Sequence, residues 1–170
     1  MAIREIITLP APVLRRKAHK VTAFGPELQS LIDDMVETMR AAPGVGLAAP
    51  QVNVPLRVIV VEFGDEENEE VPKKLYTLVN PQVVRQSDDT VIATEGCLSI
   101  PGFVGEVERF DQIQLKALNR QGKPVRIKAE GWLARIFQHE MDHLEGVLYI
   151  DRTEKVWKME EADEQVAAAD

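Results

Sequence analysis

The stretch that decides the fold runs Gln138-His139-Glu140-Met141-Asp142-His143-Leu144-Glu145-Gly146. The residues before it, 132–137, carry apolar side chains at the three- and four-residue spacing of a buried helix face, and Gly146 stands where a helix usually ends. The pattern therefore predicts a helix in the interior of the protein. On this helix His139 and His143 are one turn apart, so both imidazoles leave the same face and can bind one metal ion.

Glu140 lies about 100° around the same helix from His139. This places its carboxylate near enough to hold a water molecule beside the metal without itself being a ligand. Two alternatives are a chance occurrence of the pattern and a solvated helix face with a core histidine. The chain has only three histidines, however, and two of them lie in this pattern. We therefore predict a metal site that uses His139 and His143, with Glu140 as the base.

Composition limits the class of protein. With 170 residues, 45% hydrophobic and 28% charged, the chain is expected to form a single domain over residues 1–170. It has no apolar run of about 18 residues, so no membrane span is expected. The first five residues lack the features of a secretory signal, which predicts a cytoplasmic protein. The single cysteine agrees with a reducing compartment, and the net charge of −8 argues against nucleic-acid binding through a generally basic surface.

The order of patterns along the chain predicts an α+β fold, with mostly antiparallel strands around the central metal-binding helix. A helix is expected from Pro26 to about Ala42, because proline suits a first helical position and apolar residues follow at helical spacing. Acidic residues mark a loop at 64–70 and a C-terminal segment at 154–170, which is a candidate helix. Strands are expected at residues 56–63, 75–79, 82–85, 91–94, 113–118, 125–128 and 147–150.

The third metal ligand has two candidates. A catalytic zinc-type site uses three protein ligands and keeps one position open. Cys97 is the only thiol and lies in a turn-like break in the strands, where its side chain can point into a cleft. His19 is the competing candidate, although it sits in a polar stretch without a pattern. From the residues alone both remain open.

A loop of small residues at 44–51 ends in the uncharged side chain of Gln51. Small residues let a backbone approach a ligand closely, and an amide group can donate a hydrogen bond to a developing oxyanion. The loop differs from a phosphate-binding loop because it has no Gly-Lys-Ser/Thr sequence.

Three segments together resemble the signature motifs of the peptide deformylases, in the same order and at similar spacing. They are Gly44-Val45-Gly46-Leu47-Ala48-Ala49-Pro50-Gln51, Glu95-Gly96-Cys97-Leu98-Ser99 and the stretch 138–146. The resemblance covers roughly residues 1–150. It implies an α+β fold and a divalent metal ion, most commonly Fe2+, for which Ni2+, Co2+ or Zn2+ can substitute. A thiolate ligand suits such softer, redox-active ions.

The resemblance also implies a function for each matched residue. Cys97, His139 and His143 would hold the metal, and Glu140 would act as general base. The Gln51 side-chain amide and the Leu98 backbone N–H would stabilise the oxyanion. The substrates implied are N-formyl-methionyl peptides, that is, new chains at the ribosome, from which the formyl group is removed.

Methionine at the substrate's first position requires an apolar slot. We expect residues near the motifs to line it, namely Val45, Gly46, Leu47, Trp132 and Ile136. Two other readings of the chain remain. A metallopeptidase with the same helix would cleave internal peptide bonds and would normally use a histidine or carboxylate as third ligand. A zinc-stabilised binding module would need a fourth protein ligand and would unfold when the metal is removed.

Overall fold

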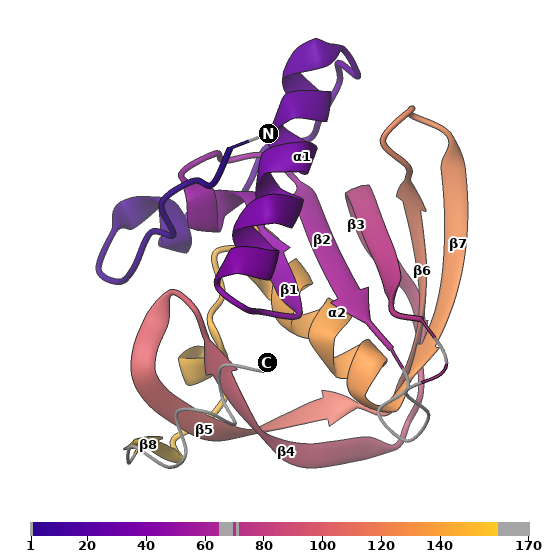
Figure 1. Cartoon of the computed structure of the whole chain (residues 1–170). Helices are drawn as coiled ribbons and strands as arrows, with labels where there is room; N and C mark the ends of the chain where they lie inside the picture. Colours follow the sequence, from indigo (N-terminus) through magenta and orange to yellow (C-terminus); the bar gives the residue numbers. More distant parts are fainter. Residues whose placement is uncertain (1, 65–69, 71, 160–170) are drawn as a thin grey trace.

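Two antiparallel sheets and two α-helices make up the computed structural model, which describes residues 2–64, 70 and 72–159 (Figure 1). One sheet contains β1 (Gly46–Ala48), β2 (Val58–Phe63), β3 (Lys74–Gln86), β6 (Gln112–Leu118) and β7 (Pro124–Glu130), in the order β1-β2-β3-β6-β7. The other contains β4 (Thr90–Cys97), β5 (Ile100–Phe110) and β8 (Val156–Lys158), in the order β4-β5-β8. Short 3-10 helices are η1 (Pro12–Arg15), η2 (Ala49–Val52) and η3 (Tyr149–Asp151).

The first long helix, α1 (Pro26–Ala41), confirms the helix predicted from the sequence. Proline occupies its first turn, where a missing N–H costs nothing. Its apolar face is fully buried at Ile32, Met35 and Met39, which pack with Val58 and Val60 of β2. This helix therefore covers one face of the five-stranded sheet at the β1–β2 end.

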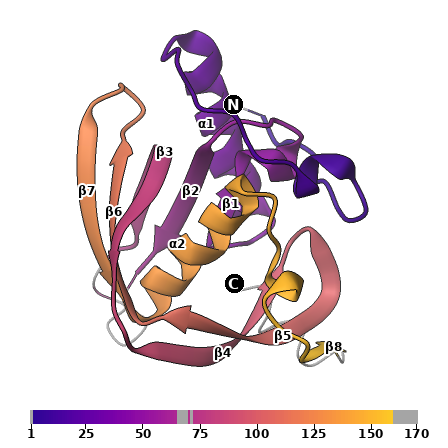
Figure 2. The same cartoon turned by 180° about the vertical axis from the view of Figure 1, so that it is seen from behind.

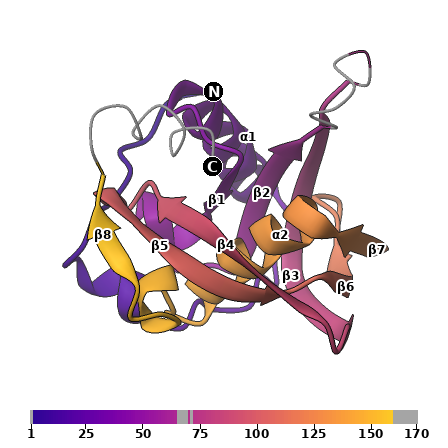
Figure 3. The same ribbon diagram turned by 90° about the horizontal axis from the view of Figure 1, so that it is seen from below.

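The second long helix, α2 (Gly131–Leu144), contains the two pattern histidines. Its apolar residues Phe137 and Leu144 are fully buried and pack with Ile59, Val61 and Leu78 on the opposite face of the same sheet. Figures 2 and 3 show α2 between the two sheets, with β4 and β5 on its other side. The predicted fold class, largely antiparallel strands around a central metal-binding helix, is confirmed.

Strand β3 differs from the prediction of two short strands at 75–79 and 82–85, because it runs without a break from Lys74 to Gln86. The predicted turn is instead a shift of register against β6 between Val79 and Gln82. Asn80 there has a positive φ of 52°. Its side chain accepts a hydrogen bond from the Val21 backbone N–H and donates one to the Val21 carbonyl, both 2.9 Å long. Contacts with a residue 59 positions away thus replace the local turn.

Three further expectations were wrong in their local structure. The small-residue loop contains β1 and η2, and the supposed break around Cys97 is the end of one long strand and the start of another. Residues 147–150 form no strand, since η3 begins at Tyr149, and Val156–Lys158 is a strand rather than part of a helix. Short apolar runs do not distinguish these states, which depend on partners distant in sequence. Most of the acidic loop (65–69) and the end of the acidic C-terminal segment (160–170) lie outside the described residues.

Among the residues that the structure describes, no helix is both long enough and apolar enough to cross a membrane.

Gly146, which ends the region of α2, generates a stability prediction. Its φ is +74°, and an added Cβ would lie 2.6 Å from the Arg15 carbonyl oxygen. Gly146→Ala should lower the free energy of unfolding by more than the roughly 1–2 kcal/mol of a left-handed alanine, because backbone atoms must also move apart. Gly122→Ala is the control, since Gly122 has φ +84° but only ordinary contacts with the Phe24 ring. Equal losses in urea unfolding of the two variants would contradict this account.

Candidate metal centre

Two elements bring the predicted metal ligands together. Cys97 is the last residue of β4, and His139 and His143 lie one turn apart on α2. The Cys97 Sγ is 3.5 Å from the His143 Nε2, and the three ligand atoms all lie within 4.8 Å of one another. His19 instead forms a β-bridge with Leu56, and the search of the described residues places it in no such group. The geometry therefore favours Cys97 as the third ligand.

The donor set fits a divalent transition metal ion. One thiolate and two imidazoles are ligands that such ions prefer, and three protein ligands leave a position for a substrate or water, as in catalytic sites. Burial lowers the pKa of His143 well below its usual value, which keeps the imidazole in the neutral form that binds metals. The His143 Nδ1 is buried without a hydrogen-bond partner among the described residues.

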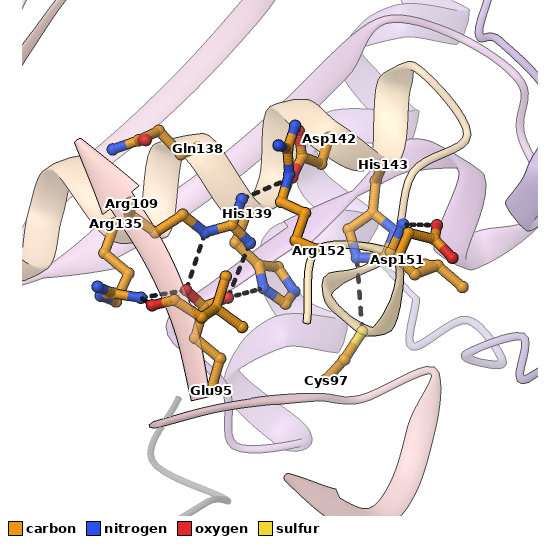
Figure 4. A network of polar contacts seen from close by, with 12 residues as sticks. Glu95, Cys97, Arg109, Arg135, Gln138, His139, Asp142, His143, Asp151 and Arg152 are labelled. Atoms are coloured by element: carbon orange, nitrogen blue, oxygen red, sulfur yellow. Dashed lines mark hydrogen bonds and ion pairs between the residues drawn. The ribbon is translucent and has the colours of Figure 1, made fainter. Parts of the chain in front are cut away.

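The Glu95 carboxylate orients His139 (Figure 4). Its Oε1 lies 2.9 Å from the His139 Nδ1, which leaves the Nε2 of that ring for the metal. Arg109 binds the same carboxylate through two nitrogens at 2.8 and 2.9 Å, and Arg135 binds it at 2.6 Å. Although burial alone would raise the pKa of Glu95, hydrogen bonds from Arg109 and His139 hold it well below its usual value. Glu95 is therefore an ionised, buried acceptor.

Asp142 extends this network away from the metal. Its carboxylate accepts a hydrogen bond of 2.6 Å from the Arg109 guanidinium. Arg152, beyond η3, donates two more, of 2.5 and 2.7 Å, to the same carboxylate. Figure 4 shows these charged side chains on one side of α2. Tyr149 of η3 stacks on the His139 ring, with 6.3 Å between ring centroids. The segment after α2 thus supports the ligand helix from outside.

Glu140 is the buried carboxyl group next to the ligands. It is 5% exposed, and its Oε1 has no hydrogen-bond partner in the described part of the chain. Burial raises its pKa to about 7. Gly46 of β1 lies directly against it, since an added Cβ there would be 2.6 Å from the Glu140 Oε2. A carboxyl group with this pKa is suited to accept and return a proton near neutral pH.

Gln51 and Leu98, the predicted oxyanion donors, lie on either side of Cys97. The Gln51 Oε1 accepts a hydrogen bond of 3.0 Å from the Ala48 backbone, which orients the amide. Its Nε2 donates to the Ser99 Oγ at 3.1 Å and lies 3.8 Å from the Cys97 Sγ. Leu98 follows Cys97 directly, in the turn between β4 and β5.

A small pocket opens beside Glu140 and His139. Of the residues expected to bind substrate, Val45, Trp132 and Ile136 line it. Gly46 lies against Glu140, whereas Leu47 is fully buried in the core beneath α1. The lining that sequence reasoning missed consists of Glu95, Gly96 and Arg135. One available signal was Arg135, which stands four residues before His139 on a helix that must be buried, and a buried arginine needs an acidic partner.

A buried helix with two histidine ligands and an adjacent glutamate, completed by one thiolate, defines a metal-dependent hydrolase. The family model described as "Polypeptide deformylase" matches residues 3–159. The chain belongs to this polypeptide deformylase family, and its activity is that of a peptide deformylase.

Individual relatives agree with this assignment. The chain is 52% identical to a peptide deformylase of Symbiobacterium thermophilum over 170 residues, which is all of this chain and 76% of the relative. The crystal structure of the Thermotoga maritima peptide deformylase is 41% identical with a TM-score of 0.83, covering 89% of this chain and 98% of that one. A class I type b peptide deformylase of Acinetobacter baumannii, solved with Met-Ala-Ser bound, is 35% identical with a TM-score of 0.82, covering 89% and 99%.

The contact between Gly46 and Glu140 predicts the effect of one methyl group. Gly46→Ala should displace the Glu140 carboxyl and reduce kcat on the order of 100-fold, since a shift of about 1 Å costs this much. Metal content should not change, because no ligand is touched. Gly44→Ala is the control, because its Cβ would meet only the mobile end of the Leu98 side chain. Unchanged kcat in Gly46→Ala would contradict the assigned contact.

Removing the Glu95 charge should destabilise the protein strongly. Glu95→Gln leaves Arg109 and Arg135 facing a neutral partner in the interior, which typically costs about 3–5 kcal/mol. Metal affinity should also fall about 10- to 100-fold, because the His139 ring loses its charged acceptor. Chemical unfolding and metal titration measure the two effects. Glu106→Gln, which alters an exposed pair with Lys155 on the adjacent strand, should change neither.

Proposed function

We propose that Glu140, Gln51 and Leu98 carry out the proton transfer and charge stabilisation of deformylation. Bound to Cys97, His139 and His143, a divalent ion supplies Lewis-acid polarisation of the formyl carbonyl and lowers the pKa of water toward 7. Glu140 accepts the proton of the attacking water, and its buried, unpartnered Oε1 is the observation that supports this most directly.

The oxyanion and the leaving group need separate partners. The Gln51 side-chain amide and the Leu98 backbone N–H would donate to the formyl oxygen as it becomes negative. Glu140 would then deliver its proton to the departing amine as the formyl C–N bond breaks. The products are formate and a peptide with a free N-terminal amine, so one proton and one water are accounted for.

The pocket beside Glu140 suits the first side chain of the substrate. Val45, Trp132 and Ile136 offer an apolar lining that fits methionine, with Gly46 giving backbone access and Leu47 backing the strand from the core. The Acinetobacter baumannii relative binds Met-Ala-Ser, which begins with methionine. We infer that N-formyl-methionyl peptides, and in the cell new chains at the ribosome, are the substrates and that the enzyme works in the cytoplasm.

The metal is proposed to be Fe2+, with Ni2+, Co2+ or Zn2+ as substitutes. A thiolate ligand favours softer ions over Mg2+ or Ca2+, which prefer oxygen. Metal analysis of protein purified without oxygen tests this, because Fe2+ and an exposed thiolate are both lost to oxidation in air. Zinc alone in anaerobic protein would contradict the proposal.

The proposed base is tested by formate release from formyl-Met-Ala-Ser with metal-loaded protein. Glu140→Gln should reduce kcat by about 100- to 10,000-fold, since the proton acceptor is lost, while one metal per chain stays bound. The surface variant Glu27→Gln, in the first turn of α1, serves as control and should keep full activity. An active Glu140→Gln enzyme would refute the proposed mechanism.

Cys97→Ser separates deformylation from the peptidase alternative. The weaker oxygen ligand should lower metal affinity and formate release together. Metal binding that survives intact, with cleavage inside an unformylated peptide, would favour a metallopeptidase instead.

A further inference from the structure

The five-stranded sheet has a face that α1 covers only in part. Val79 of β3 pairs with Leu118 of β6, and both pack in the core cluster beneath α1. Farther along β6 the same face carries Lys116 and then Gln114, whereas the alternate residues Leu115 and Ile113 point into the core with α2. Figure 1 shows β6 and β7 extending beyond α1. This part of the face is polar.

Four cations gather there in two rows across three strands. One row is Gln82–Lys116–Arg126, and the next is Arg85–Gln114–Lys128, as the strand registers give them. All of these side chains are exposed except that of Gln114, which is half-buried. The rows are about 7 Å apart along the strands and their members about 5 Å apart across them. We call these six residues the basic array.

The basic array has no acidic partners of its own. None of its four cations forms an ion pair or a side-chain hydrogen bond within the described part of the chain. Lys116 stands directly opposite Arg126, an arrangement of like charges that destabilises a sheet. The chain has 28 acidic residues against 20 basic ones, so acids to neutralise the array were available. An external anion is the remaining source of neutralisation.

We propose that the basic array binds the phosphate backbone of double-helical RNA. Protein interfaces place apolar and aromatic residues at their centre, while nucleic-acid interfaces are polar and strongly positive, as this face is. Single-stranded RNA is usually held by stacking on aromatic rings, and the array contains none. Lysine, arginine and the intervening glutamine amides are instead donors for phosphate oxygens, which give contact without sequence preference.

The net charge of −8 restrains this binding without excluding it. Net charge describes the average surface, whereas phosphate contacts depend on the local potential, which salt screens within about 10 Å. Glu130, opposite Gln112 in the next row, and Asp88 mark the acidic border of the array. The choice of RNA over DNA rests on the proposed substrate, because new polypeptides emerge from a machine made largely of RNA. The formate assay tests that premise separately.

The test is titration of a fluorescent 20-base-pair RNA duplex with the metal-loaded full chain at several salt concentrations. Four phosphate contacts predict that log K falls with log salt at a slope of about −3.6. Lys116→Gln with Arg126→Gln should reduce the magnitude of this slope by about 2. The control, Arg16→Gln with Lys20→Gln, makes the same change in charge at two exposed cations elsewhere and should leave the slope unchanged.

Other measurements keep the outcome interpretable. Both double variants should release formate at the normal rate, because the array lies on the face of the sheet opposite α2. The array variant should melt at the same or a higher temperature in low salt, since a like-charge pair is removed. Lys116→Arg with Arg126→Lys should bind RNA like the original. Equal loss in both double variants, tighter binding of polyglutamate or single-stranded RNA, or no salt-dependent binding would each overturn the proposal.

Discussion

The buried carboxylate of Glu95 is the constraint on which the metal centre depends. It accepts hydrogen bonds from a strand neighbour, Arg109, and from two residues of α2, Arg135 and His139. A buried charge is tolerated only when it is paired and hydrogen-bonded, so these partners cannot separate without a large loss of free energy. The three-stranded sheet and the ligand helix are therefore fixed to each other at the ring that binds the metal.

Close backbone approach provides the other half of the site. β1 reaches Glu140 because Gly46 has no side chain, and β4 ends at Cys97 opposite His143. The reacting groups thus come from two strands and one helix, each anchored in a packed core. A centre built on such elements is held in place before substrate arrives, which is what efficient catalysis requires.

Local patterns predicted the parts of this structure that have local causes. Helical spacing identified α1, α2 and the relation of His139, Glu140 and His143, because one turn of helix determines it. The third ligand followed only from the resemblance to deformylases, since Cys97 is 42 residues before His139. The function of Glu95 was not predicted, although it lies in a recognised motif, because its partners Arg109 and Arg135 are 14 and 40 residues away. The register shift at Asn80 likewise depends on the distant Val21.

The most direct test of this account is the protonation of the His139 ring in the zinc-loaded enzyme, observed by NMR with 15N-labelled histidine. The account predicts a proton on Nδ1, shared in a hydrogen bond with Glu95, and a metal-bound Nε2. A ring bound to zinc through Nδ1, or an Nδ1 proton in rapid exchange with solvent, would show that Glu95 does not orient the ligand and would contradict the central claim.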